Sequence, residues 1–373
     1  MHRGLDVIVE RPRDTLARPW QGYATNMQRS ILLSFIICSQ ACAAQDNPAA
    51  QKRLVPQCVG FYNVENLFDT IDSPDTDDAE FLPDGPKQWT SSRYQRKLHN
   101  MARVIAELGT DIHPDGVAVL GLGEVETGGA VEDLVRTPPI DKRGYRVVSH
   151  EGPDARGVDV ALIYDPKRFT FLRQKAYRLR IDDQPDFRTR DQLVVSGLLE
   201  GDTLHVIVNH WPSRRGGEKR SRPLRCAAAD LSRHIIDSLL ARNANARIIH
   251  MGDLNDDPVD ISMRKHLRVV GEKQFATGGM LYDPMVELYQ KGIGSLAWSD
   301  SWNLFDQISL SPALVTGAGG RYKYHSTRIY NEPYLRQKDG NFKGYPFRSF
   351  VGHEWKDGYS DHFPVYVVLV REL

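Results

Sequence analysis

Residues 247–257, with the sequence RIIHMGDLNDD, constrain the fold more than any other stretch of the chain. A short apolar run ends there in small and acidic residues, which predicts a buried strand that stops at an active site. Side chains two positions apart on a strand point the same way. We therefore expect Asp253 and Asn255 to project together, with Gly252 leaving the backbone unobstructed. The alternative is an ordinary turn rich in Asp and Asn.

The same pattern recurs elsewhere, because residues 55–63, 116–126, 204–209 and 302–311 are also apolar runs that end in, or contain, polar residues. Sheets of α/β proteins place their sites at strand ends, so we expect these polar side chains to converge. Carboxylate and amide oxygens suit Mg²⁺ or Mn²⁺, with Ca²⁺ as a further option. The strand-end residues are Asn63, Glu65, Glu124, His210, Asp253, Asn255, Asp306, Asp361 and His362.

Two helices are indicated by the spacing of apolar residues. Ser91 or Ser92 can cap a helix that runs through Leu108, with Gly109 just past its end. A second helix is expected from about Cys226 to Arg242. The stretch after Asp257, up to Gly292, is expected to be helical or irregular. These helices alternate with many hairpin-length strands, which predicts an α/β or α+β protein with more than one sheet.

A basic segment follows His210 and is expected to be a loop, because glycine and proline interrupt it. The formal net charge of the chain is zero, so binding to nucleic acid would have to depend on a local basic surface of this kind. An ordinary solvated loop is the alternative. Three aromatic residues at the expected rim of the site, Trp211, Trp298 and Tyr345, could stack on bases or contact lipid, or could equally be core residues. The basic residues are Arg214, Arg215, Lys219, Arg220, Arg222 and Arg225.

The N-terminal region resembles a leader. Residues 27–44 have an arginine before a short apolar run and then small residues, as a signal peptide does. Residues 1–26 are interpreted as an upstream extension, residues 45–54 as a linker, and residues 55–373 as one domain. The apolar run is too short to span a bilayer, and a buried N-terminal helix is the alternative interpretation. The chain is therefore expected to be exported to the periplasm or secreted, without a transmembrane segment after cleavage.

Cysteine usage leaves two questions open. Cys42 could be lipidated instead of being removed with a leader, although Ser39 stands where a lipobox has an aliphatic residue. Cys58 and Cys226 remain after cleavage, and an exported compartment would allow a disulfide between them. The sequence does not show whether they meet. It contains no CxxC or HExxH pattern, so a zinc site of either kind is not expected.

Seven motifs, taken together and in order, resemble those of the endonuclease/exonuclease/phosphatase superfamily, whose fold is DNase I-like. They are NVENLFD, GLGEVE, RGVDVALIYD, VNHWPSRRGG, MGDLNDDP, WNLFDQISLS and YSDHFPVYVVL, and the resemblance covers roughly residues 56–371. The subfamily that looks most similar consists of exported bacterial proteins. The resemblance implies a four-layer α/β sandwich in which two mixed β-sheets pack face to face with helices outside.

The resemblance also implies roles for the strand-end residues. Glu124 matches the main metal ligand, and Asn63, Glu65 and Asp361 are expected to bind the metal or to lie beside it. Asp253 matches the residue that positions or deprotonates the attacking water. Two departures affect the expected geometry only: Gly123 stands where the superfamily usually has glutamine, and Glu65 stands where some branches have aspartate.

The remaining carried-over roles concern the phosphoryl group. Asn255 matches the amide that holds the scissile phosphate, and His362 matches the histidine that contacts the phosphoryl group. Asp306 matches the carboxylate that orients this histidine, and His210 matches a histidine that can act on the leaving group. Substrate binding is expected from Arg156, Arg214, Arg215, Lys219 and Arg222.

Three functions are compatible with these motifs. The first is a metal-dependent phosphodiester hydrolase, specifically an exported endonuclease that uses Mg²⁺ or Mn²⁺ and acts as a monomer on nucleic acid. The second is a phosphatase or sphingomyelinase-like phosphodiesterase that acts on a small or lipid phosphoester. The third is a catalytically inactive surface-binding protein, which is disfavoured because every acid, amide and imidazole named above is present.

Overall fold

The computed structural model describes residues 53–298 and 300–373. The expected upstream extension, residues 1–26, and the expected signal peptide, residues 27–44, lie outside the described residues, as does Cys42. The linker that was expected to follow them also lies almost entirely outside.

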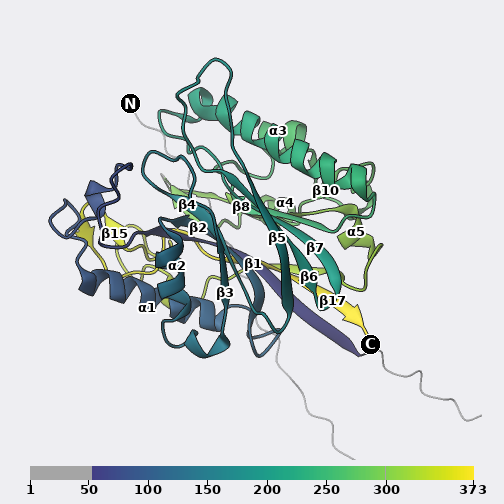
Figure 1. Ribbon diagram of the computed structural model, residues 1–373, viewed down its shortest axis with the longest axis horizontal. Coiled ribbons are helices and arrows are strands. Elements are labelled where there is room, and N and C mark those ends of the chain that lie inside the picture. The colour runs from purple at the N-terminus through teal and green to yellow at the C-terminus, as the bar shows by residue number, and fades with distance from the viewer. Residues whose placement is uncertain (1–52, 299) are drawn as a thin grey trace, which may run out of the picture. The chain divides into compact units, whose positions relative to one another are not determined.

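The first of two large sheets contains six strands in the order β14-β17-β1-β2-β4-β3 (Figure 1). Strands β1 and β2 pair in parallel, and the other neighbours pair antiparallel, so the sheet is mixed. The strands are β1 (Leu54–Leu67), β2 (Val117–Val125), β3 (Arg146–Ser149), β4 (Asp159–Tyr164), β14 (Lys323–Ile329) and β17 (Val365–Glu372).

The second sheet contains seven strands in the order β5-β6-β7-β8-β13-β10-β9. It is mixed as well, because β7 pairs with β8 and β9 with β10 in parallel, whereas β8 and β13 are antiparallel. Its strands are β5 (Phe169–Tyr177), β6 (Gln192–Leu199), β7 (Asp202–His210), β8 (Ile248–Asp253), β9 (Val269–Val270), β10 (Leu281–Tyr282) and β13 (Asp306–Leu310).

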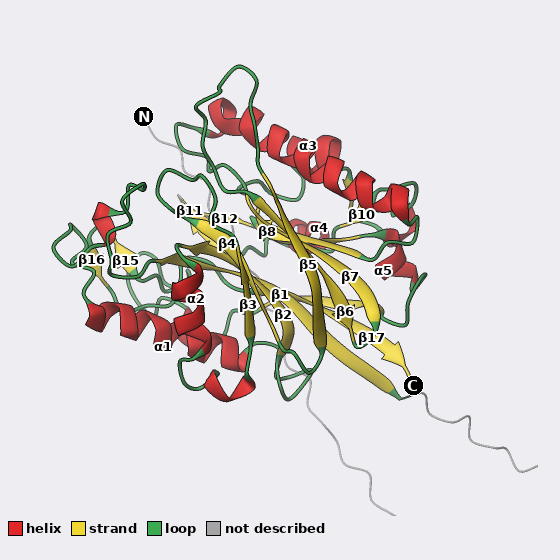
Figure 2. Cartoon of the chain, in the orientation of Figure 1, coloured by secondary structure: helices red, strands yellow, loops and turns green. Residues whose placement is uncertain are grey.

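Two small hairpins and several helices complete the described part of the chain (Figure 2). The hairpins are β11 (Leu296–Trp298) with β12 (Ser301–Asn303), and β15 (Phe350–Val351) with β16 (Glu354–Trp355). The α-helices are α1 (Ser91–Glu107), α2 (Gly128–Val135), α3 (Glu218–Arg242), α4 (Met285–Gln290) and α5 (Pro312–Thr316). Single turns of other helix types are η1 (Ala79–Phe81), η2 (Asp141–Arg143), η3 (Ser262–Leu267), η4 (Lys273–Phe275) and η5 (Pro333–Leu335).

The packing follows from the two-residue period of the strands. On β1, Cys58 and Tyr62 pack against the cluster that includes helix α1, whereas Val59 and Phe61 pack against the second sheet. On β7, Val208 faces the first sheet and Ile207 faces helix α3. Each such fully buried side chain contributes roughly 1.5–3 kcal/mol of hydrophobic stabilisation. One apolar cluster lies between helix α1 and the first sheet, a second between the two sheets, and a third between the second sheet and helix α3. The predicted four-layer α/β sandwich is therefore confirmed.

Helix α1 agrees with its prediction to within two residues at its start and one at its end. Its N-cap is Thr90 rather than Ser91 or Ser92, and the Thr90 hydroxyl accepts the N–H of Arg93 at 3.5 Å. The helix ends at Glu107, and Gly109 follows with a φ of 75°. That left-handed conformation favours glycine, which explains why the sequence stops the helix there.

The prediction for helix α3 was wrong at its N-terminus. The helix begins at Glu218 rather than near Cys226, and it includes Pro223 in its second turn. Proline removes one main-chain hydrogen bond there, but Arg222 bonds Glu218 at 2.7 Å and Arg225 bonds Asp256 at 2.6 Å. The predicted basic loop is therefore half helix, and the residues that lie on helix α3 are Lys219, Arg220, Arg222 and Arg225.

The predicted strand from Trp302 to Ser311 is divided in two. Strand β12 ends at Asn303 and β13 begins at Asp306. The main-chain groups of Leu304 and Phe305, which lie between them, bond to the turn after β8 instead of to a neighbouring strand. The stretch expected to be helical or irregular after β8 likewise contains the short strands β9 and β10, which extend the second sheet at its edge.

Cys58 and Cys226 are free thiols. Cys58 lies in β1 and packs toward helix α1, whereas Cys226 lies on helix α3, beyond the second sheet. The two sheets separate them, so the disulfide that the sequence left open does not form. Across the described residues, no helix combines the length and the apolar character that crossing a membrane requires.

Candidate active site

Strand register places three candidate residues in one row across the second sheet. Asp253, at the end of β8, is paired with His210 of β7 on one side and with Asp306 of β13 on the other. The ends of two parallel strands meet the start of an antiparallel one, so side chains that are about 50 residues apart in the sequence become neighbours. This row confirms that the polar strand ends converge.

The first sheet contributes its own strand ends to the same place. Asn63 of β1 pairs with Gly123 of β2, and Glu124 follows at a register shift. The Asn63 side-chain amide donates to Asp253 Oδ2 at 3.0 Å, and its oxygen accepts the N–H of Glu65 at 2.9 Å. Asn63 is fully buried, so this hydrogen bond ties the two sheets together and orients the Asp253 carboxylate.

The backbone is strained at three of the predicted site residues. Glu65, Glu124 and Asn255 have φ values of 52°, 63° and 52°. Left-handed backbone at a non-glycine residue costs on the order of 1–3 kcal/mol, and such strain gathers at functional sites. Hydrogen bonds hold it in place: the N–H of Asn66 donates to Glu124 Oε2, and that of Asn255 to Asp253 Oδ1, each at 3.0 Å.

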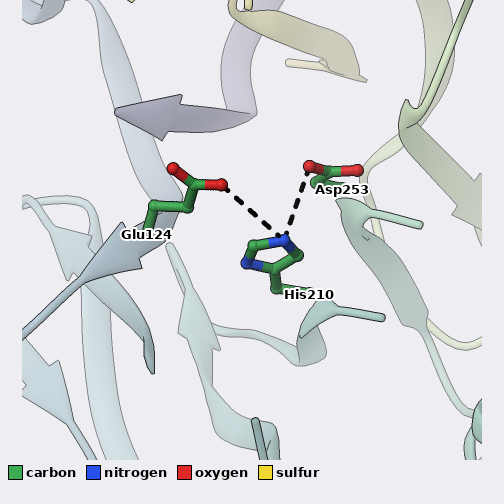
Figure 3. Close-up of side chains that lie close together, drawn as sticks. All are labelled: Glu124, His210 and Asp253. Atoms are coloured by element: carbon green, nitrogen blue, oxygen red, sulfur yellow. Dashed lines mark ion pairs between the residues drawn. The ribbon is translucent and has the colours of Figure 1, made fainter. Parts of the chain in front are cut away.

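Glu124, His210 and Asp253 form a compact cluster in which one ligand atom from each lies within 4.8 Å of the others (Figure 3). The imidazole points between the two carboxylates, with His210 Nε2 3.9 Å from Glu124 Oε1 and 3.6 Å from Asp253 Oδ2. Two carboxylates and one nitrogen fit Mg²⁺ or Mn²⁺, with the imidazole better suited to Mn²⁺. This donor set is the part of the described chain that could hold a cation.

Burial lowers the pKa of His210 well below its usual value, and the positive charges of Arg190 and Arg156 lower it further. Its Nδ1 atom is buried without a hydrogen-bond partner. The ring is therefore neutral at neutral pH, and it can either bind a cation or exchange a proton with a leaving oxygen.

His362 has the opposite charge preference. Burial alone would lower its pKa, but the Asp306 carboxylate, whose Oδ2 lies 2.7 Å from His362 Nδ1, raises it well above the usual value, with help from Asp253 and Asp361. The other ring nitrogen, Nε2, lies 3.8 Å from Asp253 Oδ2. His362 is thus a buried cation that faces the same carboxylate as His210.

Asp253 and Asn255 line the same cavity, as their spacing predicted. Burial raises the pKa of Asp253 to about 7, and the His362 charge opposes this shift. The Asn255 side-chain amide donates one hydrogen bond to the Trp211 carbonyl at 3.0 Å. Its second N–H and its oxygen are left for a ligand.

Glu65 and Asp361, two of the predicted metal-binding or metal-adjacent residues, contact a different segment. The Glu65 carboxylate accepts the main-chain N–H of Ser349 at 2.6 Å, and Asp361 Oδ2 lies 2.6 Å from the Arg348 guanidinium. Burial raises the pKa of Glu65 to about 7. Neither residue belongs to the cluster around Glu124, and their role at a metal stays a prediction.

A cavity of about 470 Å³ opens over the cluster and brings arginines to it. Arg156 and Arg215, both predicted to bind substrate, line this cavity. Arg214 lies 2.7 Å from Asp260 and also bonds Asp256, and Arg222 bonds Glu218, so these two are already engaged within the protein. Lys219 is exposed on helix α3 and does not line the cavity.

Sequence reasoning missed several charged residues around the site. Arg188 and Arg190 also line the cavity, and Arg190 is buried between Asp154 and the carbonyl of His210. Lys97 is fully buried and donates to Ser349 and to the carbonyl of Tyr359. Lys97 had a visible signal, because it falls on the apolar face of the predicted helix. Arg188 and Arg190 had no such signal in the sequence, because they lie in an ordinary polar segment.

The aromatic residues expected at the rim divide into two groups. Trp211 is buried in the core beneath helix α3. Trp298 is 68 % exposed on the β11–β12 hairpin, and both it and Tyr345 line a cavity beside the site.

Two mixed sheets packed face to face, with acids, an amide and imidazoles gathered at their strand ends, define the DNase I-like class of α/β proteins. A model of the Endonuclease/Exonuclease/phosphatase family matches residues 58–371, so the chain belongs to that family. No curated protein matches the sequence.

Three solved structures resemble the chain at low sequence identity. TDP2 from Caenorhabditis elegans is 15% identical with a TM-score of 0.50, and the match covers 84% of this chain and 74% of that one. The mannosyl-6-phosphatase Bt3783 of Bacteroides thetaiotaomicron is 18% identical with a TM-score of 0.49 over 84% and 99%. The catalytic domain of human Nocturnin is 15% identical with a TM-score of 0.49 over 86% and 97%. At this identity the likeness concerns the fold and indicates no substrate.

Proposed function

We propose that the protein is a divalent-metal-dependent hydrolase of phosphodiester bonds, and that nucleic acid is its substrate. One observation carries the proposal: the Asp253 carboxylate is fixed by Asn63 and faces His210 on one side and His362 on the other. Phosphoester hydrolysis needs proton transfer and stabilisation of negative charge. The Asp253 carboxylate and the neutral His210 can transfer protons, and the cationic His362 can stabilise the charge.

Glu124 would hold the cation, because its carboxylate is partly exposed and faces the cluster. Asp253 and His210 lie close enough to contribute ligand atoms. When bound, Mg²⁺ or Mn²⁺ neutralises negative charge on the phosphoryl group. The site's two carboxylates and neutral imidazole fit such an ion, since they give it compensating charge without a competing cation inside the cluster.

The remaining steps belong to side chains of this chain. Asp253 orients the attacking water and takes its proton, and Asn255 holds a phosphoryl oxygen through its free N–H. His362, kept charged by Asp306, donates to a nonbridging oxygen and stabilises the charge that grows there. His210, whose Nε2 lies 3.6 Å from Asp253 Oδ2, receives the proton that Asp253 takes from water and passes it to the leaving oxygen. The geometry that supports these roles is the row of three strand ends with Asn63 opposite.

A polyanionic substrate is supported by Arg156, Arg188 and Arg215, which line the catalytic cavity. Arg188 and Arg215 are exposed, and Arg156 is about half exposed. Their charges can contact phosphates on either side of the one that is cut. Such contacts would give an endonuclease its affinity without any preference for sequence.

A small phosphoester is the second candidate substrate. It is favoured by the engagement of Arg214, Arg222 and Arg225 with acids of this chain. These three residues are half of the basic residues on which the nucleic-acid prediction depended. Because they pair with acids of this chain, that prediction is weaker. The family includes phosphatases by name, so a phosphatase or a sphingomyelinase-like enzyme is the alternative to the proposed nuclease.

A substrate panel tests the proposal directly. Plasmid DNA, RNA, bis-p-nitrophenyl phosphate and p-nitrophenyl phosphate are each incubated with the protein and Mg²⁺ or Mn²⁺, with and without EDTA. We expect the diesters to be cleaved, cleavage to stop with EDTA, and the Asp253→Asn variant to be inactive while still folded. Cleavage at full rate in EDTA, or cleavage of the monoester alone, would contradict the proposed activity.

Export is part of the proposal for an extracellular or periplasmic nuclease, and it rests on the leader-like residues 27–44. Expression of the full chain in a bacterial host, followed by cell fractionation and N-terminal sequencing, measures it. We expect a mature N-terminus near residue 45. An intact N-terminus in the cytoplasmic fraction would exclude export.

A further inference from the structure

A second cavity, of about 410 Å³, lies beside the candidate active site. It is formed by the β11–β12 hairpin and by the segment that leads to the β15–β16 hairpin, and we call it the aromatic cavity. Its volume is in the range of small-molecule sites. Its main lining residues are Trp298, Gln337, Phe342, Tyr345, Arg348 and Asp361.

The aromatic cavity lies close to the proposed catalytic residues. Asp361 Oδ1, at its edge, and Asp253 Oδ2 lie 3.9 Å and 3.8 Å from the same atom, His362 Nε2. Trp298 also lines a third cavity, of about 700 Å³, whose wall includes Asn255 and His362. The aromatic cavity therefore adjoins the space around His362, at Asp361 and at Trp298.

Some aromatic side chains in and beside the cavity pack against other rings, and others are largely exposed to solvent. Trp302 stacks on Phe363, the neighbour of His362, with ring centroids 6.1 Å apart and an interplanar angle of 20°. Tyr345 packs edge-on against Trp302 at 5.4 Å, and Phe342 lies 6.0 Å from Tyr345. Trp298 and Phe342 are 68 % and 57 % exposed. Two large, mostly exposed rings, Trp298 and Phe342, thus lie beside the packed pair of Trp302 and Phe363.

The rim of the cavity is polar in a way that suits a flat heterocycle. The Gln337 side chain is half-buried and makes no hydrogen bond to another described residue, so its amide offers a donor and an acceptor. Arg348 is paired with Asp361 at 2.6 Å. Single exposed aromatic residues are ordinary on protein surfaces. Here, however, exposed rings and a free amide surround one cavity beside the proposed phosphoryl site. This arrangement suits a ligand that has a flat ring with polar edges.

We propose that the aromatic cavity binds the nucleobase of the substrate nucleotide, next to the phosphate that is cut. This inference rests on the proposed phosphodiesterase function and narrows its substrate to nucleotide-type phosphoesters. Base stacking on an exposed tryptophan is tolerant of sequence because every base has a π-face. The cavity therefore selects for the presence of a base rather than for its identity.

Equilibrium binding separates this inference from the catalytic proposal. Adenosine 5′-monophosphate and ribose 5-phosphate differ only by the base, and their affinities are measured by titration calorimetry in EDTA, where no turnover is expected. The variants are Trp298→Ala, Trp298→Phe and, as a control, Phe275→Ala, which removes a 55 % exposed ring outside the cavity. We expect the nucleotide to bind about tenfold tighter than the sugar phosphate.

Trp298→Ala should remove that tenfold difference by weakening the nucleotide alone, whereas Trp298→Phe and Phe275→Ala should keep most of it. Equal affinity for both ligands in the unmodified protein would overturn the base-binding role, and so would an advantage that survives Trp298→Ala. If the nucleotide is preferred but no phosphodiester is cleaved, the proposed catalytic function fails and the base site stands. If diesters are cleaved but the nucleotide binds no more tightly than the sugar phosphate, the catalytic function stands and the base site fails.

Discussion

Nδ1 of His362 lies 2.7 Å from Oδ2 of Asp306, and this contact joins the two sheets of the sandwich. Asp306 begins β13 in the second sheet, and His362 lies just before β17 in the first. Asp306 is fully buried, its Oδ1 atom has no hydrogen-bond partner, and its Oδ2 atom also accepts the Ser295 hydroxyl. A buried carboxylate with so few other partners holds the adjacent imidazole in its charged form and in a single orientation.

We expect Asp306→Asn to lower kcat by roughly 10²–10⁴-fold, the range in which a positioned acid or base contributes. The amide can still bond to His362 but carries no charge, and it can select the wrong tautomer of the ring. KM for bis-p-nitrophenyl phosphate should change little. The measurement is steady-state kinetics with Mn²⁺ together with the melting temperature.

Asp283→Asn is a matched control, because Asp283 is also fully buried and follows β10 in the same sheet, yet it bonds Met285 and Ser309 instead of a histidine. It should leave kcat within about twofold. Equal rates for Asp306→Asn and the unmodified protein would remove the His362 pair from the mechanism.

The metal site is probed by Glu124→Gln. Losing this charge should cost roughly 10²–10³-fold in kcat and should abolish the rise in melting temperature that a bound ion produces by mass action. Glu126→Gln is the control: Glu126 is two residues further on, and its carboxylate bonds Asp69 and Ser73 outside the cluster. A Mn²⁺-dependent melting shift that persists in Glu124→Gln but disappears in Glu126→Gln would refute the assignment.

The strand ends could be predicted from the sequence because buried strands appear as apolar runs whose polarity changes abruptly. Asp253, His210 and Asp306 were found in that way, and parallel and antiparallel pairing then aligned them. The pattern of strands and helices predicted only an α/β or α+β protein with more than one sheet, and the resemblance to a known family implied the four layers. These features depend on local composition and on a topology shared by a whole family, so one sequence was sufficient.

Tertiary ion pairs account for much of what the sequence concealed. Gly217 and Pro223 suggested a loop, but the buried pair between Arg225 and Asp256 supports helix through that segment. Trp211 was a candidate for the rim and is core, whereas Trp298 is exposed. Nothing in the local pattern distinguishes two tryptophans whose burial is decided by what packs on them.

Stability should depend on pH through Asp283. Burial raises the pKa of its carboxyl to about 7 from the ordinary 3.8, so the folded protein holds a proton there that the unfolded chain has lost. This contribution is full below pH 4 and is lost as the pH rises to about 7. One pKa unit corresponds to about 1.4 kcal/mol. Asp283→Asn removes the effect.

Relative to the unmodified protein, the Asp283→Asn variant should therefore gain roughly 2–3 kcal/mol in free energy of unfolding between pH 5 and pH 8. Urea denaturation at pH 5, 6, 7 and 8 measures the difference, and Glu132→Gln, at a half-exposed residue of helix α2 that pairs with Arg136, is the control. A difference between variant and unmodified protein that is constant over this range would show that Asp283 ionises normally.

The final prediction separates the two substrate classes through the arginines of the catalytic cavity. Arg156, Arg188 and Arg215 line it, and a polynucleotide should contact them through phosphates other than the one that is cut. Binding would then weaken steeply with salt, with a log-log slope of roughly −0.9 per phosphate neutralised. Replacing all three with serine should reduce the slope for DNA by about 2–3 and raise its KM, while KM for bis-p-nitrophenyl phosphate changes much less.

The matched control replaces Lys142, Arg146 and Lys167, three exposed basic residues that do not line this cavity. This triple change has the same effect on net charge, so it should leave the salt slope nearly unchanged if the slope arises from contacts in the cavity. The readout is KM against ionic strength for DNA and for the chromogenic diester in all three proteins. If both triple variants shift the slope equally, only the overall charge matters, and the cavity arginines then do not contact a polynucleotide. A small phosphoester would in that case be the better assignment, because such a substrate occupies the catalytic residues without spanning the cavity.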